Sequence, residues 1–103
     1  MRPLLTPPAA SRDTNSVQMV NAWIAEKALH CSLNIGFFQG AGHNEPEAWG
    51  IVLADMVRHI ANALHEEHGV ARSETITLLL DSLHSELDTP TSDVQGEFHP
   101  RMS

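Results

Sequence analysis

Apolar and polar residues alternate strictly over residues 29–35, and this is the clearest short pattern in the 103-residue chain. Strict alternation is typical of a strand with one buried face. The residues are Leu29, Cys31, Leu33 and Ile35 on the apolar side and His30, Ser32 and Asn34 on the polar side. We therefore predict a half-buried strand, with Cys31 as a small buried residue rather than a nucleophile.

A helical pattern precedes this strand, and a glycine-rich stretch follows it. Asn15 with Gln18 three residues later resembles a capping box, and apolar residues then recur at helical spacing up to Ala28. We predict a short first helix over residues 15–28. The glycines around Gly40 and Gly42 break the pattern and predict a flexible loop.

Two further helices follow the loop. Residues 44–47 (NEPE) form a capping box with proline in the first turn, and Gly69 supplies a left-handed stop, so the helix between them runs roughly 34 Å. Ser73 caps a third helix that ends before Pro90. Gly50 inside the long helix costs about 1 kcal/mol relative to alanine. We expect it to pack closely against another backbone, so that Gly50→Leu destabilises the fold.

Together these patterns predict a helix-rich α+β domain over residues 14–89: one main strand, then a long helix and a third helix. Residues 1–13 and 90–103 are expected to be flexible tails. The strand needs a partner for its backbone groups, and nothing else alternates as clearly. It can pair with the same strand of a second copy, with a short strand near residues 37–38 or the termini, or prove shorter than the pattern indicates. We favour a homodimer paired through residues 29–35.

Composition narrows the classes of function. Six Lys and Arg against 13 Asp and Glu give a formal charge of −7, without the basic run that tracks phosphates, so nucleic-acid binding is disfavoured. The single cysteine excludes an internal disulfide and a multi-cysteine zinc site, and favours a reducing compartment. No apolar run approaches the about 20 residues that a membrane span needs, and no signal-peptide core is seen at the N-terminus. We expect a soluble cytoplasmic protein.

Three segments resemble a known group of sequences: residues 22–25 (AWIA), residues 29–33 (LHCSL), and residues 48–55 (AWGIVLAD) with Arg58 and His59 following. They are similar to a domain-of-unknown-function family of small bacterial proteins, mostly proteobacterial. The resemblance covers residues 16–68. It implies no activity and no catalytic residue, and the glycine-rich loop at residues 40–42 is expected to be an addition in this chain.

One polar face of the long helix gathers Asp55, His59, Asn62 and Glu66 at spacings of four, three and four. Asp55 can orient and activate His59, as a general base or metal ligand requires. Arg58 can bind a carboxylate, or pair with Asp55 one turn back. The alternative is a solvated face whose pairs add a few tenths of a kcal/mol each.

The remaining candidates have ordinary structural explanations. His65 and His68 are spaced for a shared metal, but the metalloprotease pattern needs histidines four positions apart, and these are three apart. The helix dipole accounts for both without a metal. His30 lies on the polar side of the strand, where it lines a ligand groove or faces water. Trp23 and Trp49 fall on apolar stripes and are expected as core anchors or dimer-interface residues.

Two functions follow from these observations. The first is a homodimeric binding or accessory module without a cofactor, which contacts another protein or a small ligand. The second is a small enzyme or metal-binding protein that uses Asp55 and His59, which requires those side chains to converge in a concave site.

Overall fold

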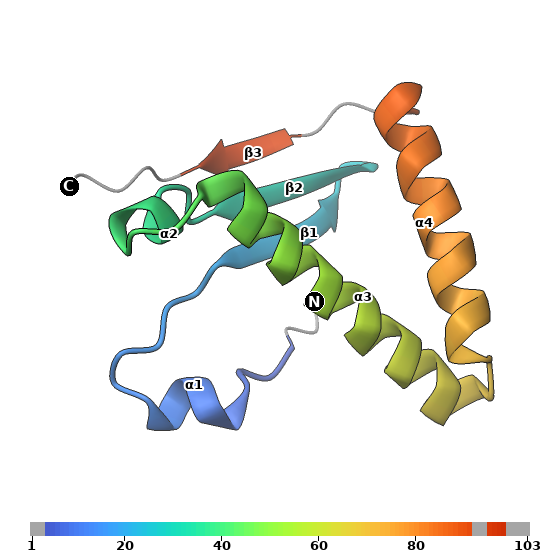
Figure 1. The fold of residues 1–103 in the computed structure, drawn as a ribbon, viewed down its shortest axis with the longest axis horizontal. Helices are drawn as coiled ribbons and strands as arrows, with labels where there is room; N and C mark the ends of the chain where they lie inside the picture. The colour runs from blue at the N-terminus through green and yellow to red at the C-terminus, as the bar shows by residue number, and fades with distance from the viewer. Residues whose placement is uncertain (1–3, 92–94, 99–103) are drawn as a thin grey trace.

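A computed structural model describes residues 4–91 and 95–98, with the side chains of residues 95–98 left aside. In chain order the elements are α1 (Pro8–Arg12), β1 (Val20–Ala25), β2 (Ala28–Leu33), α2 (Phe37–Gly40), α3 (Glu45–His68), α4 (Arg72–Asp88) and β3 (Gln95–Phe98). Figure 1 shows their arrangement. The predicted α+β, helix-rich class is confirmed, with the predicted strand followed by the long helix and the next helix.

The sheet has three strands in the order β1-β2-β3. β1 and β2 form an antiparallel hairpin in which Val20 pairs with Leu33 and Ala25 with Ala28. The two turn residues, Glu26 and Lys27, both have positive φ (51° and 65°), as in a type I′ turn. β3 pairs with β2 in parallel, so β2 is the central strand.

The helix predicted over residues 15–28 is wrong, because β1 occupies its second half. The capping signal was misleading: the backbone amide of Asn15 donates to Asp13 Oδ1 at 2.8 Å within a turn. Apolar Val20, Trp23 and Ile24 suit a strand as well as a helix, and pairing with β2 decides between the two.

The homodimer contact through residues 29–35 is also wrong, because both edges of β2 are occupied within the chain. Two elements lie inside the predicted tails: α1 within residues 1–13 and β3 within residues 90–103. Residues 1–3, 92–94 and 99–103 of those tails lie outside the described residues. The domain boundaries at residues 14 and 89 stay predictions.

The long helix follows the sequence closely. Asn44 Oδ1 accepts a hydrogen bond from the Glu47 backbone amide at 3.0 Å, which is the expected N-cap. At the other end Gly69 adopts φ 70°, and its amide donates to the His65 carbonyl at 3.0 Å. α4 begins one residue before Ser73, with Ala71 at the N-cap and no side-chain cap.

Two other expectations, for the glycine-rich loop and for Gly50, need correction. The loop predicted over residues 39–43 is shorter than expected: residues 39 and 40 end the short helix α2, and residues 41–43 form the turn that follows it. Gly50 does not pack closely on another backbone, since a Cβ at this position would meet no described atom within 4 Å. The expected loss of stability in Gly50→Leu therefore has no basis in the described part of the chain.

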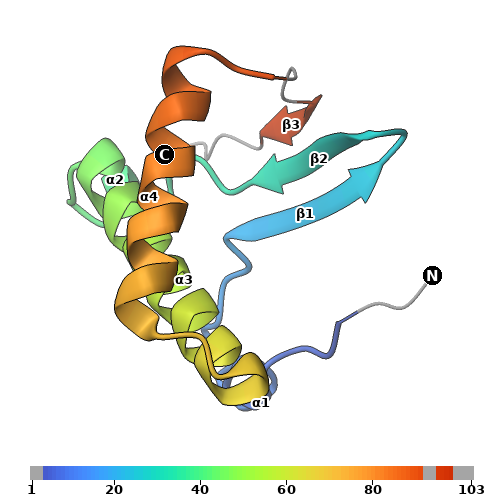
Figure 2. The same cartoon turned by 90° about the vertical axis from the view of Figure 1, so that its right-hand side faces the viewer.

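Helices and sheet form two layers that diverge from each other. Figure 2 shows α3 and α4 on one side and the β1-β2 hairpin extending away from them. Within the described residues the buried side chains are Ala61 (1% exposed) and Thr75 (7%), which belong to α3 and α4 respectively. None of the helices in residues 4–91 has the length and apolar character that crossing a bilayer requires.

Candidate functional site

Glu45 is the most highly connected polar side chain at the start of α3. Its Oε2 accepts hydrogen bonds from the Gly36 backbone amide at 2.9 Å and from Trp49 Nε1 at 2.7 Å. Its Oε1 accepts one from the Gln39 backbone amide at 2.8 Å. One carboxylate thus caps the start of α2, which has no side-chain cap of its own, and joins it to α3.

These contacts determine the ionisation of Glu45. Partial burial raises the pKa of its carboxyl, but hydrogen bonds from the amides of Gly36, Gln39 and Phe38 and from the Trp49 indole lower the pKa by more. The pKa of Glu45 therefore lies below its ordinary value. The side chain is a permanent acceptor with a structural role, and it is unsuited to act as a general acid at neutral pH.

This role of Glu45 was not predicted, because the sequence pattern places Glu45 only in the capping box of its own helix. The signal was the glycine-interrupted stretch before α3, whose amides need acceptors. Trp49 is half-buried, and its ring meets Phe38 edge to face, with centroids 5.9 Å apart. Trp23 is not buried; it is 42% exposed, and its Nε1 donates to Asn21 Oδ1 at 2.7 Å.

The predicted polar face of α3 does not form a convergent site. Asp55 makes an exposed ion pair with Arg58, the contact with Arg58 that the spacing allowed. Asn62 Oδ1 accepts from Arg72 Nε at 2.8 Å and so links α3 to α4. His59 lies exposed, and no hydrogen bond to Asp55 is formed among the described residues.

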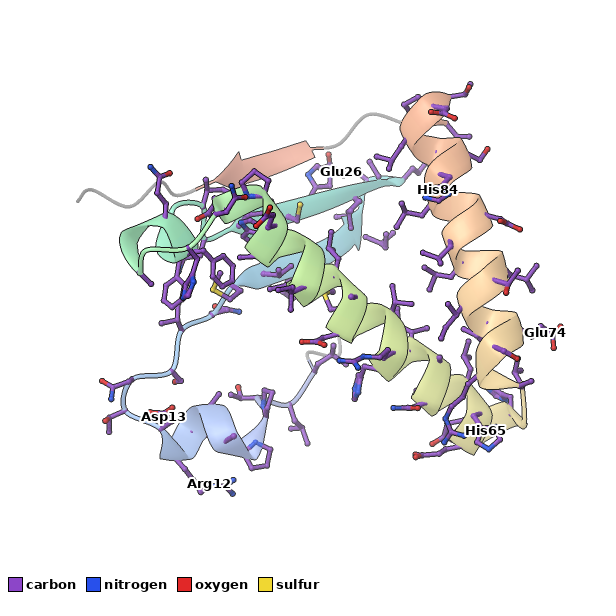
Figure 3. The ribbon with its side chains drawn as sticks, in the orientation of Figure 1. Arg12, Asp13, Glu26, His65, Glu74 and His84 are labelled. Carbon is purple, nitrogen blue, oxygen red and sulfur yellow. The ribbon has the colours of Figure 1, made fainter. Side chains whose placement is uncertain are left out.

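The other candidates lie apart from one another. His65 Nδ1 is 3.2 Å from the Val70 carbonyl oxygen, at the turn between α3 and α4, where Figure 3 labels it. His68 is the last residue of α3 and is exposed, as is Glu66. His30 is half-buried and pairs across the hairpin with Trp23. Within residues 4–91 and 95–98, no three His, Cys, Asp or Glu side chains are grouped to hold a metal ion.

The exposed apolar side chains of α3 and α4 form a second candidate surface. Many large apolar side chains are exposed, and two sets share a spacing of i, i+3 and i+7. The α3 stripe consists of Leu53, Met56 and Ile60 (50%, 43% and 42% exposed), and the α4 stripe of Leu80, Leu83 and Leu87 (39%, 36% and 73%). This spacing places each set on one face of its helix. Within the described residues these side chains therefore do not belong to a buried core.

Comparison with known proteins identifies a family and a fold. The family described as a domain of unknown function, DUF5076, matches residues 3–91. No curated protein matches the chain. The expected resemblance to a family of unknown function is confirmed.

The chain is also similar to a solved structure from the photosynthetic bacterium Rhodopseudomonas palustrus CGA009, a protein assigned provisionally as a pyruvate dehydrogenase. The match has a TM-score of 0.67 at 20% identity, and covers 100% of this chain and 97% of the other. At this identity the similarity establishes the shared fold alone.

Proposed function

We propose that this chain, which belongs to the DUF5076 family, is a non-catalytic accessory module that assembles as a homodimer and acts by contacting another protein. One observation carries the proposal: among the described residues Ala61 is the only buried apolar side chain, whereas most leucines and isoleucines of α3 and α4 are exposed and the rest are half-buried. A monomer with so little core has almost no hydrophobic stabilisation to offset its loss of conformational entropy.

The charged surface supports contact with a protein partner. The formal charge of −7 doubles in a dimer, which favours a partner with a basic surface. On α3 the polar face of Asp55, His59 and Asn62 lies far around the helix from the α3 stripe, by helical geometry. Assembly through the apolar side therefore leaves this polar face accessible. The single cysteine is consistent with a cytoplasmic location.

The alternative is an enzyme or metal-binding protein that uses Asp55 and His59. It has less support, because Asp55 is engaged by Arg58 and the two candidate residues do not converge. A general base needs an orienting group within hydrogen-bond reach, and Asp55 does not orient His59 in this arrangement.

The test combines mass measurement with partner capture. Sedimentation of the full chain should give twice its 11.3 kDa mass at micromolar concentration. Capture from a native lysate should then recover a specific protein that is lost with Asp55→Ala, His59→Ala. A matched pair on α4, Glu74→Ala, His84→Ala, should retain it.

Two outcomes contradict the proposal. The first is a folded monomer at every accessible concentration. The second is a dimer whose captured proteins are the same for wild type, the α3 variant and the α4 control, since the polar face of α3 would then contribute no contact.

A further inference from the structure

The hairpin of α3 and α4 is closed at one end and open at the other. The two helices meet near the turn at residues 69–71, where Ala61 and Thr75 are buried. Figure 1 shows them diverging from that turn. From Leu80 to Asp88 every residue of α4 is exposed. Half of an amphipathic helix thus stands without anything to cover its apolar side.

The exposed area is larger than a chain of this size has as a compact monomer. The total accessible area is 8731 Å², whereas a folded monomer of 11.3 kDa exposes roughly 5,700 Å². The radius of gyration is 15.6 Å, against roughly 13 Å for a compact domain of 103 residues. The surplus is about 3,000 Å², and the mostly exposed N-terminal segment of residues 4–16 contributes part of it beside the helices.

This surplus matches the needs of an obligate homodimer. Such an interface removes about 2,000–5,000 Å² in total, or about 1,000–2,500 Å² from each chain. An interface at the lower end of that range, about 1,000 Å² from each chain, is well within this surplus. A transient contact with another protein buries less and would leave most of the surplus exposed.

Resting on the self-assembly proposed above, we infer that a second copy of this chain covers the α3 stripe and the α4 stripe, so that α3 and α4 of both chains form one intersubunit helical bundle. Both stripes consist only of Leu, Met and Ile. A twofold contact brings the same surface of each chain together, and uncharged apolar stripes are complementary to themselves. Their spacing of three and four residues is the one that pairs of packed helices use.

The small core also favours a second copy, rather than a different protein, as the molecule that covers the two stripes. A chain whose described residues include one buried apolar side chain needs its partner whenever it folds, because the interface supplies the missing core. A second copy is always present at the same concentration as the chain itself, whereas a different protein is not.

The edge strand β1 is the competing surface. It lies at the border of the sheet, and its six residues (VNAWIA) carry no charge. Pairing β1 with another strand would satisfy backbone groups but leave both stripes exposed. The helices are therefore favoured over this edge as the dimer contact.

The experiment places a charge on each stripe and compares it with the opposite face of the same helix. The test variants are Leu83→Glu and Ile60→Glu. The controls are Leu78→Glu and Ile51→Glu, whose side chains are already 60% and 65% exposed off the stripes. In sedimentation equilibrium each test variant should raise the dimer dissociation constant at least about 100-fold, while each control changes it less than about threefold.

A second measurement keeps the inference testable if a charged variant does not fold. Wild-type chains, half of them labelled with ¹³C and ¹⁵N, are mixed and examined by isotope-filtered NMR for contacts between copies. Contacts between the methyl groups of Leu53, Ile60, Leu80, Leu83 and Leu87 are expected.

The possible results separate the two proposals. A dimer that persists in Leu83→Glu and Ile60→Glu, or intersubunit contacts centred on Val20 and Ile24 of β1, overturns the assignment of the surface and leaves self-assembly intact. A wild-type chain that is folded and monomeric overturns both.

Discussion

The first turn of α3 and the open end of the α3–α4 hairpin differ in how fully their side chains are partnered within the chain. Around Glu45 each carboxylate oxygen has donors from nearby residues, at 2.7 to 2.9 Å. At the open end, apolar side chains such as Leu83 and Leu53 remain exposed. Polar groups need only a few partners, which a short loop supplies, whereas apolar side chains need a large covered area. Within the chain the polar groups around Glu45 find their partners, whereas the apolar side chains of the helices need a second molecule to cover them.

The largest effect is expected from truncating a stripe residue. Ile60→Ala should lower the free energy of unfolding by about 2–4 kcal/mol per chain, because Ile60 becomes core in the assembled protein. Ile51→Ala, on the opposite face of α3, should cost less than about 1 kcal/mol. Urea denaturation at one protein concentration measures both. Equal small losses would show that the α3 stripe stays exposed.

The next largest effect is expected from removing the Glu45 carboxylate at the first turn of α3. Glu45→Ala leaves the amides of Gly36 and Gln39 and the Trp49 indole without their carboxylate, so the melting temperature should fall. Glu47→Ala is the matched control, since Glu47 is also an acidic residue of the first turn. A fall of the same size in both variants would mean that only the helix dipole matters.

The same residue gives a pH dependence whose direction follows from its lowered pKa. The pKa of Glu45 is lower in the folded chain than the about 4.3 expected when unfolded. Its contribution to stability is therefore present above the unfolded pKa and is lost as pH falls through the folded pKa. The difference in melting temperature between wild type and Glu45→Gln should shrink between pH 7 and pH 3. A constant difference would contradict the role of the ionised carboxylate.

Sequence reasoning succeeded where the signals are local and failed where the chain pairs with distant residues. The capping residues Asn44 and Gly69 bound α3 correctly, because both act within one helical turn. β1 was assigned to a helix, since its apolar residues fit either period and only pairing with β2 distinguishes them. Which apolar stripe a single chain covers depends on the angle between α3 and α4, which no local pattern reports.

A substitution at Thr75 is expected to raise the stability of the closed end of the α3–α4 hairpin. Its hydroxyl is buried between α3 and α4 and has no hydrogen-bond partner in the described part of the chain. Thr75→Val keeps the shape and removes the unsatisfied group, so stability should rise by about 1 kcal/mol. Thr77→Val, at an exposed position of α4, controls for helix propensity. A loss of stability in Thr75→Val would indicate that the hydroxyl is bonded in solution.

A substitution at Gly50 tests whether the second copy also contacts α3 outside the α3 stripe. Nothing described lies within 4 Å of an added Cβ there, so Gly50→Ala should stabilise the helix by up to about 1 kcal/mol. Thermal melting at several protein concentrations is the measurement. If Gly50→Ala instead weakens the dimer, a backbone of the second copy approaches this position, and the interface extends beyond the two stripes.

The smallest effect is expected at Asp55, the residue that sequence reasoning placed first among catalytic candidates. Its ion pair with Arg58 is exposed, with the two side chains 58% and 72% accessible, and such pairs contribute about 0–1 kcal/mol. Asp55→Asn should therefore change the free energy of unfolding by less than about 0.5 kcal/mol, and added salt should remove even that. Denaturant titration at low and high salt measures the difference. A large loss that persists at high salt would mean that Asp55 is buried in the assembled protein, and the polar face of α3 would then belong to the interface rather than to the surface left for a partner.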